Sequence, residues 1–517
     1  MLLPEMLARN ARLFADETAL VERDPKMGTR REITWMDFYI QANSFAGALV
    51  SLGLKKGDRV VLIMTNCLEW LPIYFGILSA GCVAVPLNFR FEAETISHCA
   101  LLSGAKCLIF GPEFIERINS VKTGLDRSVS SYIFVGQPGL RPVYAQAHAD
   151  LLSVSRNTKP DIDILLTDRA GIYFTSGTTG VPKGVLLTHR QLEFSCYVEN
   201  HHHRQTHADN FLCIPPLYHT GAKMHWFGNF MVGAPTVLLK GVKPRWILDA
   251  VSEEMVTIVW LLVPWAHDII VAIENSDLDP ADFRLGQWRL MHIGAQPVPP
   301  TLIRKWRRYF PEQEYDTNYG LTEATGPGCV HLGVENTHKI GAIGVPGFDW
   351  ECRVVDEIGN DLPYETAGEL WVKGPGVMEK YYRNPDATAA SLTKGWLHTG
   401  DIVRKDEEGF LWLIDRKKDI IISGGENIFP VEIEDFLMTH DDIMDAAVIG
   451  VPHERLGEAV AAVIQLKTGK RLDTDDIFRF CEALPRYKRP GRIFFDKVSR
   501  NPTGKIEKPK LREKYGN

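Results

Sequence analysis

Short apolar runs alternate with amphipathic stretches along most of this chain, and this alternation constrains the fold more than any other feature. The amphipathic segments include TWMDFYIQANSFAGALVSLG and TLIRKWRRYF. The apolar runs are RVVLIM (59–64), KCLIF (106–110), TVLLK (236–240), TIVWLLV (257–263) and RLMHIG (289–294). Strands that alternate with helices predict an α/β architecture of largely parallel sheets covered by helices.

The chain has 517 residues, too many for one hydrophobic core. Around residue 340 the pattern changes, and Gly and Asp turns separate short strands in ECRVVDEIGNDLP and GELWVKGPGVMEKYY. A small β-rich unit is expected there. The charged cluster 415–419 then stands between two β-branched runs, as a linker would, and about 100 residues of α+β pattern follow it. A helix is expected to start there at Pro430, with Glu432 and Glu434 in its first turn.

Charge and cysteine content exclude several classes of protein. A net charge of -7 argues against nucleic acid as a partner. The nine Cys contain no CxxC pair, which predicts reduced thiols in a cytoplasmic protein, without a disulfide frame or a zinc site. The N-terminus shows no signal-peptide pattern. The uncharged run 70–87 has the length of a membrane span, but Pro72, Gly81 and Pro86 interrupt it, so a buried helix, a turn and a strand are expected.

The stretch YFTSGTTGVPKG (173–184) carries the features of a phosphate-binding loop. Its Gly residues can expose consecutive backbone N–H groups, its hydroxyls add donors, and Lys183 adds a point charge. The loop does not fit GxxxxGK[ST], because Gly184 stands where a magnesium-binding hydroxyl would follow the Lys. On composition alone, a mobile Gly- and Thr-rich surface loop is an equal alternative.

The string TSGTTGVPKGV, followed by Thr188 and His189, resembles the signature of adenylate-forming enzymes. Further segments resemble that family's motifs in family order, with Ile293 in place of one Gly. They are PPLYHTGA (215–222), HIGAQPV (292–298), YDTNYGLTEAT (315–325), GELWVKGPGVMEKYYRNPDAT (368–388), GWLHTGD (395–401), DRKKDIIISGGENIFPVEIE (415–434) and NPTGKI (501–506). One such match carries little weight, whereas the ordered set covers essentially the whole chain.

The resemblance implies a fold and a reaction. The fold is α/β, with a large N-terminal domain of parallel-rich sheets and helices, a small β-barrel-like subdomain, and a small mobile α+β C-terminal domain. The expected boundaries are 1–415 for the adenylation domain, 416–420 for the hinge and 421–517 for the mobile domain. The reaction is that of an AMP-forming acyl-CoA synthetase, which uses ATP, Mg²⁺ and coenzyme A. It converts a carboxylate to acyl-AMP and pyrophosphate, then transfers the acyl group to CoA.

The resemblance also assigns roles in ATP binding. Glu323 is the expected magnesium ligand, since Mg²⁺ takes one or two protein carboxylates plus phosphate oxygens. Thr322 is the expected α-phosphate contact, Asp401 the ribose anchor, and Arg416 its neighbour. The β- and γ-phosphates are assigned to Thr175, Ser176, Gly177, Thr178, Thr179, Gly180 and Lys183. The adenine site is assigned to Tyr319 as an aromatic face, with Gly294, Ala295, Gln296, Asp316 and Asn318 along its edge.

The two half-reactions are expected to use different parts of the C-terminal domain. Lys505 would stabilise the charge that develops during adenylation. Relatives then rotate this domain about a hinge residue, which corresponds to Lys418. The loop Ser423, Gly424, Gly425 and Glu426 would enter the site and line the tunnel for the thiol arm of CoA. The alternative for Lys505 and for the run 416–418 is that they are solvated basic residues on the surface, without a role in the reaction.

The acyl pocket is assigned to segments around residues 219 and 294. Its candidates are His219, Gly221, Met224, His225, Gly294, Ala295 and Gly320. Gly221 stands where some aryl-CoA ligases carry a larger aromatic residue, which predicts a pocket with room. No Asp occurs in PPLYHTGA to bind an amino group, so an amino acid is disfavoured. A small-to-medium aliphatic, alicyclic or aromatic carboxylate is the predicted substrate.

The stretch HHHRQTH (201–207) is expected to form a surface loop and not a metal site. Its adjacent His residues lack a common facing direction, and no acidic partner is evident nearby. Two alternatives to a CoA ligase remain at this stage. They are an adenylating enzyme that loads a carrier protein, and a non-catalytic nucleotide-binding relative. A homodimer is one oligomeric state open to the chain.

Overall fold

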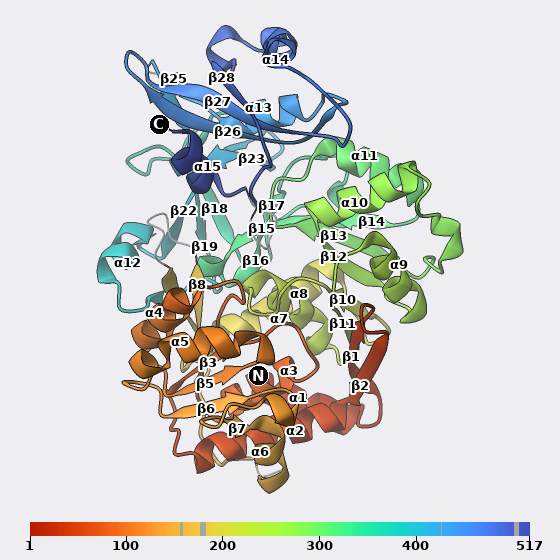
Figure 1. Ribbon diagram of the computed structural model, residues 1–517, viewed down its shortest axis with the longest axis vertical. Coiled ribbons are helices and arrows are strands. Elements are labelled where there is room, and N and C mark those ends of the chain that lie inside the picture. The colour runs from red at the N-terminus through yellow and green to blue at the C-terminus, as the bar shows by residue number, and fades with distance from the viewer. Residues whose placement is uncertain (156–158, 176–181, 425, 501–505, 517) are drawn as a thin grey trace.

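The computed structural model describes residues 1–155, 159–175, 182–424, 426–500 and 506–516. Figure 1 shows a smaller C-terminal part, drawn in blue, at one end of a larger N-terminal part. The N-terminus lies within the larger part and the C-terminus within the smaller one (Figure 1).

An eight-stranded sheet occupies the part of the molecule farthest from the C-terminal lobe (Figure 1). Its strands, in spatial order, are β20 (Lys380–Tyr381), β9 (Lys183–Thr188), β8 (Arg169–Thr175), β4 (Val83–Pro86), β3 (Arg59–Ile63), β5 (Cys107–Phe110), β6 (Ser131–Phe134) and β7 (Gln146–Ala147). The strands from β8 to β7 pair in parallel, whereas β9 and β20 pair antiparallel at one edge.

A seven-stranded sheet lies beside it, and all its pairs are parallel except β1 with β2. Its order is β14 (Glu314–Asp316), β13 (Leu290–Gly294), β12 (Ile258–Leu262), β10 (Phe211–Cys213), β11 (Thr236–Leu239), β1 (Thr18–Asp24) and β2 (Thr29–Thr34). The five strands expected from the apolar runs are therefore β3, β5, β11, β12 and β13, within one residue at each end.

Two smaller antiparallel sheets form the β-rich unit that was expected around residue 340. The first of their strands begins earlier in the chain than expected, at Asn318. One contains β15 (Asn318–Leu321), β16 (Gly326–His331) and β17 (Val345–Pro346). The other contains β18 (Glu351–Val355), β19 (Gly368–Lys373), β22 (Trp396–Lys405), β21 (Leu392–Thr393) and β23 (Leu411–Arg416), which pairs with β22.

The C-terminal lobe has a sheet of its own. It comprises β25 (Glu426–Ile428), β24 (Ile421–Ser423), β27 (Gly457–Leu466), β26 (Ile443–His453) and β28 (Arg492–Phe495). Its helices are α13 (Pro430–Leu437), α14 (Thr474–Phe480) and α15 (Lys508–Tyr515). The expected helix start at Pro430 is confirmed, because Pro fixes φ at a helical value and lacks only a donor that would be unpaired there.

The remaining helices cover the two large sheets. They are α1 (Leu3–Leu13), α2 (Trp35–Ser51), α3 (Trp70–Ser79), α4 (Ala93–Ser103), α5 (Ile115–Leu125), α6 (His148–Val154), α7 (His189–His203), α8 (Thr220–Met231), α9 (Pro244–Glu253), α10 (Val263–Glu274), α11 (Pro300–Tyr309) and α12 (Pro385–Ser391). One core joins α2, α3, α7 and α8 to both sheets. Separate cores pack α9, α10 and α11 on the seven-stranded sheet, and α4 and α5 on the eight-stranded sheet.

The uncharged run 70–87 folds as its interruptions predict. Helix α3 is buried along its whole length, Gly81 turns the chain with φ +65°, and β4 follows. Within the described residues, no helix combines the length and the apolar character that a bilayer crossing requires.

Candidate functional site

Asp401 lies between Tyr319 and Arg416, and these three residues form the predicted ribose and adenine side of the site. The Tyr319 hydroxyl donates to Asp401 Oδ2 over 2.5 Å, and Arg416 Nε lies 3.1 Å from Asp401 Oδ1. Asp401 and Arg416 face each other across β22 and β23, so the strand register brings them together. Burial and the Asp401 carboxylate raise the pKa of Tyr319, which keeps its hydroxyl a donor.

Glu323 and Lys183 meet through Tyr381, which the sequence reasoning did not single out. The Tyr381 hydroxyl donates to Glu323 Oε1 over 2.8 Å, and Lys183 Nζ lies 5.2 Å from the centre of the Tyr381 ring. Strand β20 pairs with β9, and this pairing places the phenol beside the predicted phosphate loop. Tyr381 lies in the segment 368–388, which resembles a family motif. This resemblance is the sequence signal that could have identified Tyr381.

Thr175 and Lys183 are the described ends of the phosphate-binding loop. They are register partners across the β8–β9 hairpin, which fixes the two ends of the loop side by side. The predicted site residues outside the described part of the chain are Ser176, Gly177, Thr178, Thr179, Gly180, Gly425 and Lys505.

The predicted adenine-side loop starts at Gly294, where an added side chain would make ordinary van der Waals contacts. A Cβ added at Gly294 would meet no atom closer than 3.8 Å. Ala295 follows with φ +69°, a left-handed conformation that is uncommon for a residue with a Cβ. Gln296 Oε1 accepts from Arg500 Nη1 of the C-terminal lobe over 3.2 Å. This contact brings the residue just before the segment 501–505 to the adenine-side loop.

Asp316 was expected at the edge of the adenine, but its carboxylate faces the interior. The residue is fully buried, and Oδ1 accepts from the backbone N–H groups of Thr317 and Gly333 over 2.7 and 2.8 Å. The side chain of Asp316 therefore cannot line the adenine site, and only its main chain could contact adenine. Asn318, two residues later, places its amide nitrogen 3.0 Å from His225 Nε2.

His219 begins α8 and shapes the acyl-pocket segment. Its Nδ1 accepts from the backbone N–H of Gly221 over 3.2 Å, which caps the helix. Thr220 Oγ1 lies 3.4 Å from Thr322 Oγ1, so the start of α8 reaches the motif that carries Glu323. Gly320 lies within β15, between Tyr319 and Leu321.

The room expected at Gly221 is absent. A Cβ added there would approach the Trp260 indole to 2.8 Å, closer than real Cβ contacts come. Trp260, on strand β12, fills the space beside Gly221 of α8 with an aromatic ring. Met224 is buried and accepts from Ser195 Oγ over 3.3 Å, so it packs in the core.

The expectation of a surface loop at 201–207 is wrong for its first residues. His201, His202 and His203 end α7, and His203 is only 2% exposed. Its ring contacts two carboxylates, with Nδ1 3.2 Å from Glu199 and Nε2 3.1 Å from Asp316. Glu199 lies one helical turn earlier, so an acidic partner was present in the sequence, whereas Asp316 arrives through the tertiary fold.

The predicted hinge lies in a single 3₁₀ turn, η6 (Lys417–Asp419). Asp415 Oδ2 accepts from the Val431 N–H over 3.0 Å, and Arg512 lies 2.9 Å from Asp419. Both contacts join the strand before the turn, or the turn itself, to the C-terminal lobe. The predicted CoA-side residues Ser423, Gly424 and Glu426 belong to the β24–β25 hairpin, where Gly424 has φ +60°.

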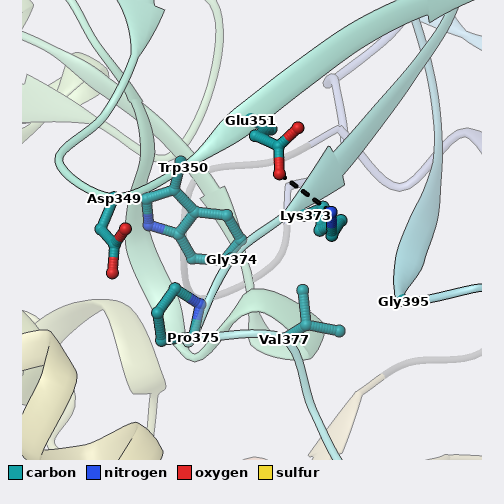
Figure 2. A pocket seen from close by; sticks show the side chains of 8 residues that line it. All are labelled: Asp349, Trp350, Glu351, Lys373, Gly374, Pro375, Val377 and Gly395. Atoms are coloured by element: carbon teal, nitrogen blue, oxygen red, sulfur yellow. Dashed lines mark hydrogen bonds and ion pairs between the residues drawn. The ribbon is translucent and has the colours of Figure 1, made fainter.

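A separate hollow of about 510 Å³ opens on the surface near β18 and β19. Figure 2 shows Trp350 and Pro375 along it, with an ion pair between Lys373 and Glu351 at its rim. None of the predicted site residues lines this hollow. The hollow is therefore separate from the predicted site.

Comparisons with known proteins agree with this arrangement. The family model described as AMP-binding enzyme matches residues 7–382, and the model described as AMP-binding enzyme C-terminal domain matches 432–505. A feruloyl-CoA synthase of an Amycolatopsis species is 33% identical over 491 residues, 94% of each chain. A long-chain-fatty-acid–CoA ligase of Mycobacterium tuberculosis is 31% identical over 485 residues, 93% of each chain.

A solved structure has a similar fold over nearly the full length. The o-succinylbenzoate CoA synthetase of Bacillus subtilis, in complex with ATP and magnesium ion, superposes with a TM-score of 0.83 at 26% identity, covering 98% of this chain and 99% of that one. The chain belongs to the AMP-binding, or adenylate-forming, enzymes. Within that family it is an AMP-forming acyl-CoA synthetase, which uses ATP, Mg²⁺ and CoA to form a carbon–sulfur bond.

Proposed function

We propose that this synthetase activates a small-to-medium carboxylate as its acyl-AMP and passes the acyl group to CoA at the site around Asp401, Glu323 and Lys183. The observation that carries the proposal is the position of Asp401. Tyr319 and Arg416 hold its two oxygens at 2.5 and 3.1 Å. A carboxylate oriented in this way can accept from both ribose hydroxyls of ATP.

Glu323 suits a magnesium ion by its chemistry. It is a carboxylate, the ligand type that Mg²⁺ prefers, and Tyr381 orients one of its oxygens. The bound ion would neutralise triphosphate charge during adenylation. Lys183 would add positive charge at the phosphates with the loop 176–180, and Thr322 would contact the α-phosphate. The Tyr381 phenol would keep Glu323 and Lys183 in a fixed relation.

We assign Lys505 to the adenylation step and Lys418 to the hinge that follows it. The Arg500–Gln296 contact supports the first assignment, since it ties the residue just before 501–505 to the adenine-side loop. After adenylation, rotation at η6 would replace this segment by Ser423, Gly424, Gly425 and Glu426. The domain boundaries 1–415, 416–420 and 421–517 are part of the same proposal.

For the acyl group we propose a pocket formed by His219, Gly221, Met224, His225, Gly294, Ala295 and Gly320. Trp260 makes this pocket narrower beside Gly221 than the sequence indicated. At Gly294 an added Cβ would make only ordinary van der Waals contacts, at 3.8 Å or more, so the pocket segment is less tightly packed there than at Gly221. The relatives named above act, by their names, on feruloyl, long-chain fatty acyl and o-succinylbenzoyl groups, so the family alone does not choose among carboxylates.

The test is an AMP-release assay with a panel of aliphatic, alicyclic and aromatic acids, Mg²⁺ and ATP, with and without CoA. We expect AMP and no ADP as the nucleotide product. Its release should require CoA and should occur with one group of the acids. AMP release at the same rate without CoA would contradict the ligase assignment and favour an enzyme that loads a carrier protein. Absence of pyrophosphate with every acid would favour a non-catalytic relative.

We also propose a cytoplasmic location and leave a homodimer as the oligomeric state to be measured. All nine cysteines are free, which supports a reducing compartment. Light scattering of the purified protein at two concentrations distinguishes a dimer from a monomer.

A further inference from the structure

A buried cluster of imidazoles and carboxylates lies behind the acyl-pocket segment, and of its side chains the proposed function uses only His225. We call it the imidazole cluster, and it comprises Glu199, His203, His225, His292 and Asp316. Each of these residues is at most 2% exposed. They come from α7, α8, β13 and β14, so the tertiary fold gathers them. Burying this many polar groups costs free energy unless each one finds a partner.

We propose that His203 Nε2, His292 Nδ1 and Asp316 Oδ2 bind a divalent transition-metal ion of the zinc type. One ligand atom from each of His203, His292 and Asp316 lies within 4.8 Å of the other two. Asp316 Oδ2 is 3.1 Å from His203 Nε2 and 3.6 Å from His292 Nδ1. Ligand atoms at about 2.0–2.1 Å from a tetrahedral Zn²⁺ lie about 3.3 Å apart, which is between these two distances.

The hydrogen-bond pattern leaves one ring nitrogen, His292 Nδ1, without a partner among the described residues, and a bound cation would supply that partner. His225 Nδ1 lies 2.6 Å from the Gly221 carbonyl oxygen, so this nitrogen carries the proton and donates. His225 Nε2 lies 2.8 Å from His292 Nε2, and since His225 has its proton elsewhere, His292 Nε2 must be the donor.

His292 Nδ1 is then an unprotonated acceptor that faces another acceptor. Asp316 Oδ2 lies 3.6 Å from it, too far for a direct hydrogen bond. Among the described residues, His292 Nδ1 has no hydrogen-bond partner. Two buried acceptors at this distance are spaced as two ligands of one metal ion would be. A proton on His203 would serve Glu199 and Asp316, but it would leave His292 Nδ1 unsatisfied.

The groups around the three ligands match the outer shell of a metal site. Metal-bound His residues donate their second ring N–H to a carboxylate, a carbonyl or a similar acceptor. His203 Nδ1 lies 3.2 Å from a Glu199 carboxylate oxygen, close enough for an ion pair although not aligned as a hydrogen bond, and His292 donates to His225. Asp316 Oδ1 accepts from two backbone N–H groups, which leaves Oδ2 for the ion.

Charge also favours a dication. Within the described residues, no Lys or Arg forms an ion pair with Glu199 or Asp316. One divalent ion neutralises both carboxylates while the three imidazoles stay neutral. His203 is the last residue of α7, and a helix C-terminus favours positive charge. The ion would join α7 to β13 and β14 and would be structural, separate from the magnesium at Glu323.

The first test is the metal content of the full-length protein. The protein is stripped with a chelator, incubated with excess ZnSO₄, passed through a desalting column, and analysed by inductively coupled plasma mass spectrometry. We expect about one zinc per chain for the wild type. Cobalt(II) in place of zinc should give the visible d–d absorption of a low-coordinate site with nitrogen and oxygen ligands. Less than about one tenth of a zinc per chain would overturn the proposal.

Matched variants then assign the site. His292→Gln and Asp316→Asn should lower the zinc content at least tenfold, and zinc should no longer raise their Tm. His201→Gln is the control, because His201 is exposed on the same helix and belongs to none of the ligands. It should keep one zinc and the wild-type Tm shift. Equal zinc content in His292→Gln and the wild type would also overturn the proposal. If a variant does not fold, the Tm shift and the cobalt spectrum of the wild type remain decisive.

Discussion

At the scale of single residues, two phenols hold the two carboxylates of the candidate site. Tyr319 donates to Asp401 and Tyr381 donates to Glu323. Each bond fixes one carboxylate oxygen in a buried setting, and Arg416 contacts the second oxygen of Asp401. Hydrogen bonds to charged groups contribute more than neutral ones, so the phenols should matter for activity as well as for packing.

Removing the Tyr381 hydroxyl tests this arrangement. In Tyr381→Phe, Glu323 loses a donor, and kcat/KM for Mg-ATP should fall by roughly tenfold or more, with a higher requirement for Mg²⁺. A magnesium titration of the pyrophosphate-release rate measures both effects. Tyr382→Phe, at the neighbouring position, is the matched control and should behave as the wild type. Equal activity of the two variants would show that the phenol does not orient Glu323.

A second residue-scale prediction concerns Lys223, which is fully buried on α8. Burial lowers its pKa well below 10.5, although the Tyr173, Tyr74 and Trp70 rings lie 4.3, 4.8 and 5.9 Å from Nζ. Nζ has no hydrogen-bond partner among the described residues. Lys223→Met should therefore stabilise the protein by on the order of 1–3 kcal/mol at pH 7.

The pH dependence of this effect follows from the direction of the pKa change. Between the folded pKa and 10.5 the unfolded chain binds more protons than the folded chain, so the stability of the wild type rises with pH. The advantage of the Met variant should shrink from pH 7 to pH 10. Urea unfolding of both proteins at the two pH values measures it. A Met variant less stable than the wild type at pH 7 would contradict the prediction.

At the scale of elements, two short segments set up the proposed catalytic cycle. The β8–β9 hairpin holds Thr175 and Lys183 as register partners, so the two ends of the loop share one rigid base. The turn η6 connects β23, which carries Arg416, to the first strand of the C-terminal lobe. Rotation at this turn changes which part of the lobe faces the site and leaves the hairpin in place.

Lys418→Pro tests the hinge. Proline fixes φ near one value, so we expect normal formation of acyl-AMP but at least tenfold slower formation of acyl-CoA. Single-turnover measurements of pyrophosphate and thioester separate the two steps. Lys418→Ala is the control and should retain both rates, because it removes the side chain without restricting φ. A wild-type rate of thioester formation in the Pro variant would place the hinge elsewhere.

Lys505→Ala should show the opposite pattern. Adenylation should fall by several orders of magnitude because the proposed transition-state charge loses its cation. Conversion of supplied acyl-AMP and CoA to thioester should continue. A similar loss in both half-reactions would contradict the role proposed for Lys505.

At the scale of the whole molecule, the C-terminal lobe contacts the N-terminal part beside the proposed adenine site. Arg500 contacts Gln296 at 3.2 Å and also Asp445 of its own lobe at 2.7 Å. Arg500 therefore contacts both its own lobe and the N-terminal part of the molecule. This geometry corresponds to the adenylation step of the proposed cycle.

Arg500→Gln should weaken that interface. We expect ATP–pyrophosphate exchange to slow by roughly tenfold, since a charge-assisted contact is lost, with less effect on the use of supplied acyl-AMP. Arg479→Gln is a matched control, because Arg479 makes an ion pair on the exposed surface of α14. If both half-reactions slowed equally, the contact would be structural only.

Local patterns predicted most of the elements and the partners that lie close in sequence. The run 70–87 became α3 and β4, and the Pro430 start of α13 was also foreseen. The site was less accessible from sequence, since Tyr381, Trp260 and the ring contacts of His203 depend on residues far along the chain. The reading of Gly221 as open space failed because Trp260 fills that space from β12.

The sequence by itself determined the class of this protein. Apolar periodicity specified the layered α/β fold, and the ordered motifs specified the adenylate-forming family with its ATP, magnesium and CoA chemistry. Tertiary structure alone decided which side chains from distant parts of the chain are in contact. Glu199 lies one helical turn from His203, but Asp316 and His292 meet that ring only because β13 and β14 are neighbours in a sheet packed beside α7. Periodicity encodes which face of an element is buried, whereas contacts between elements depend on how the sheets and helices pack.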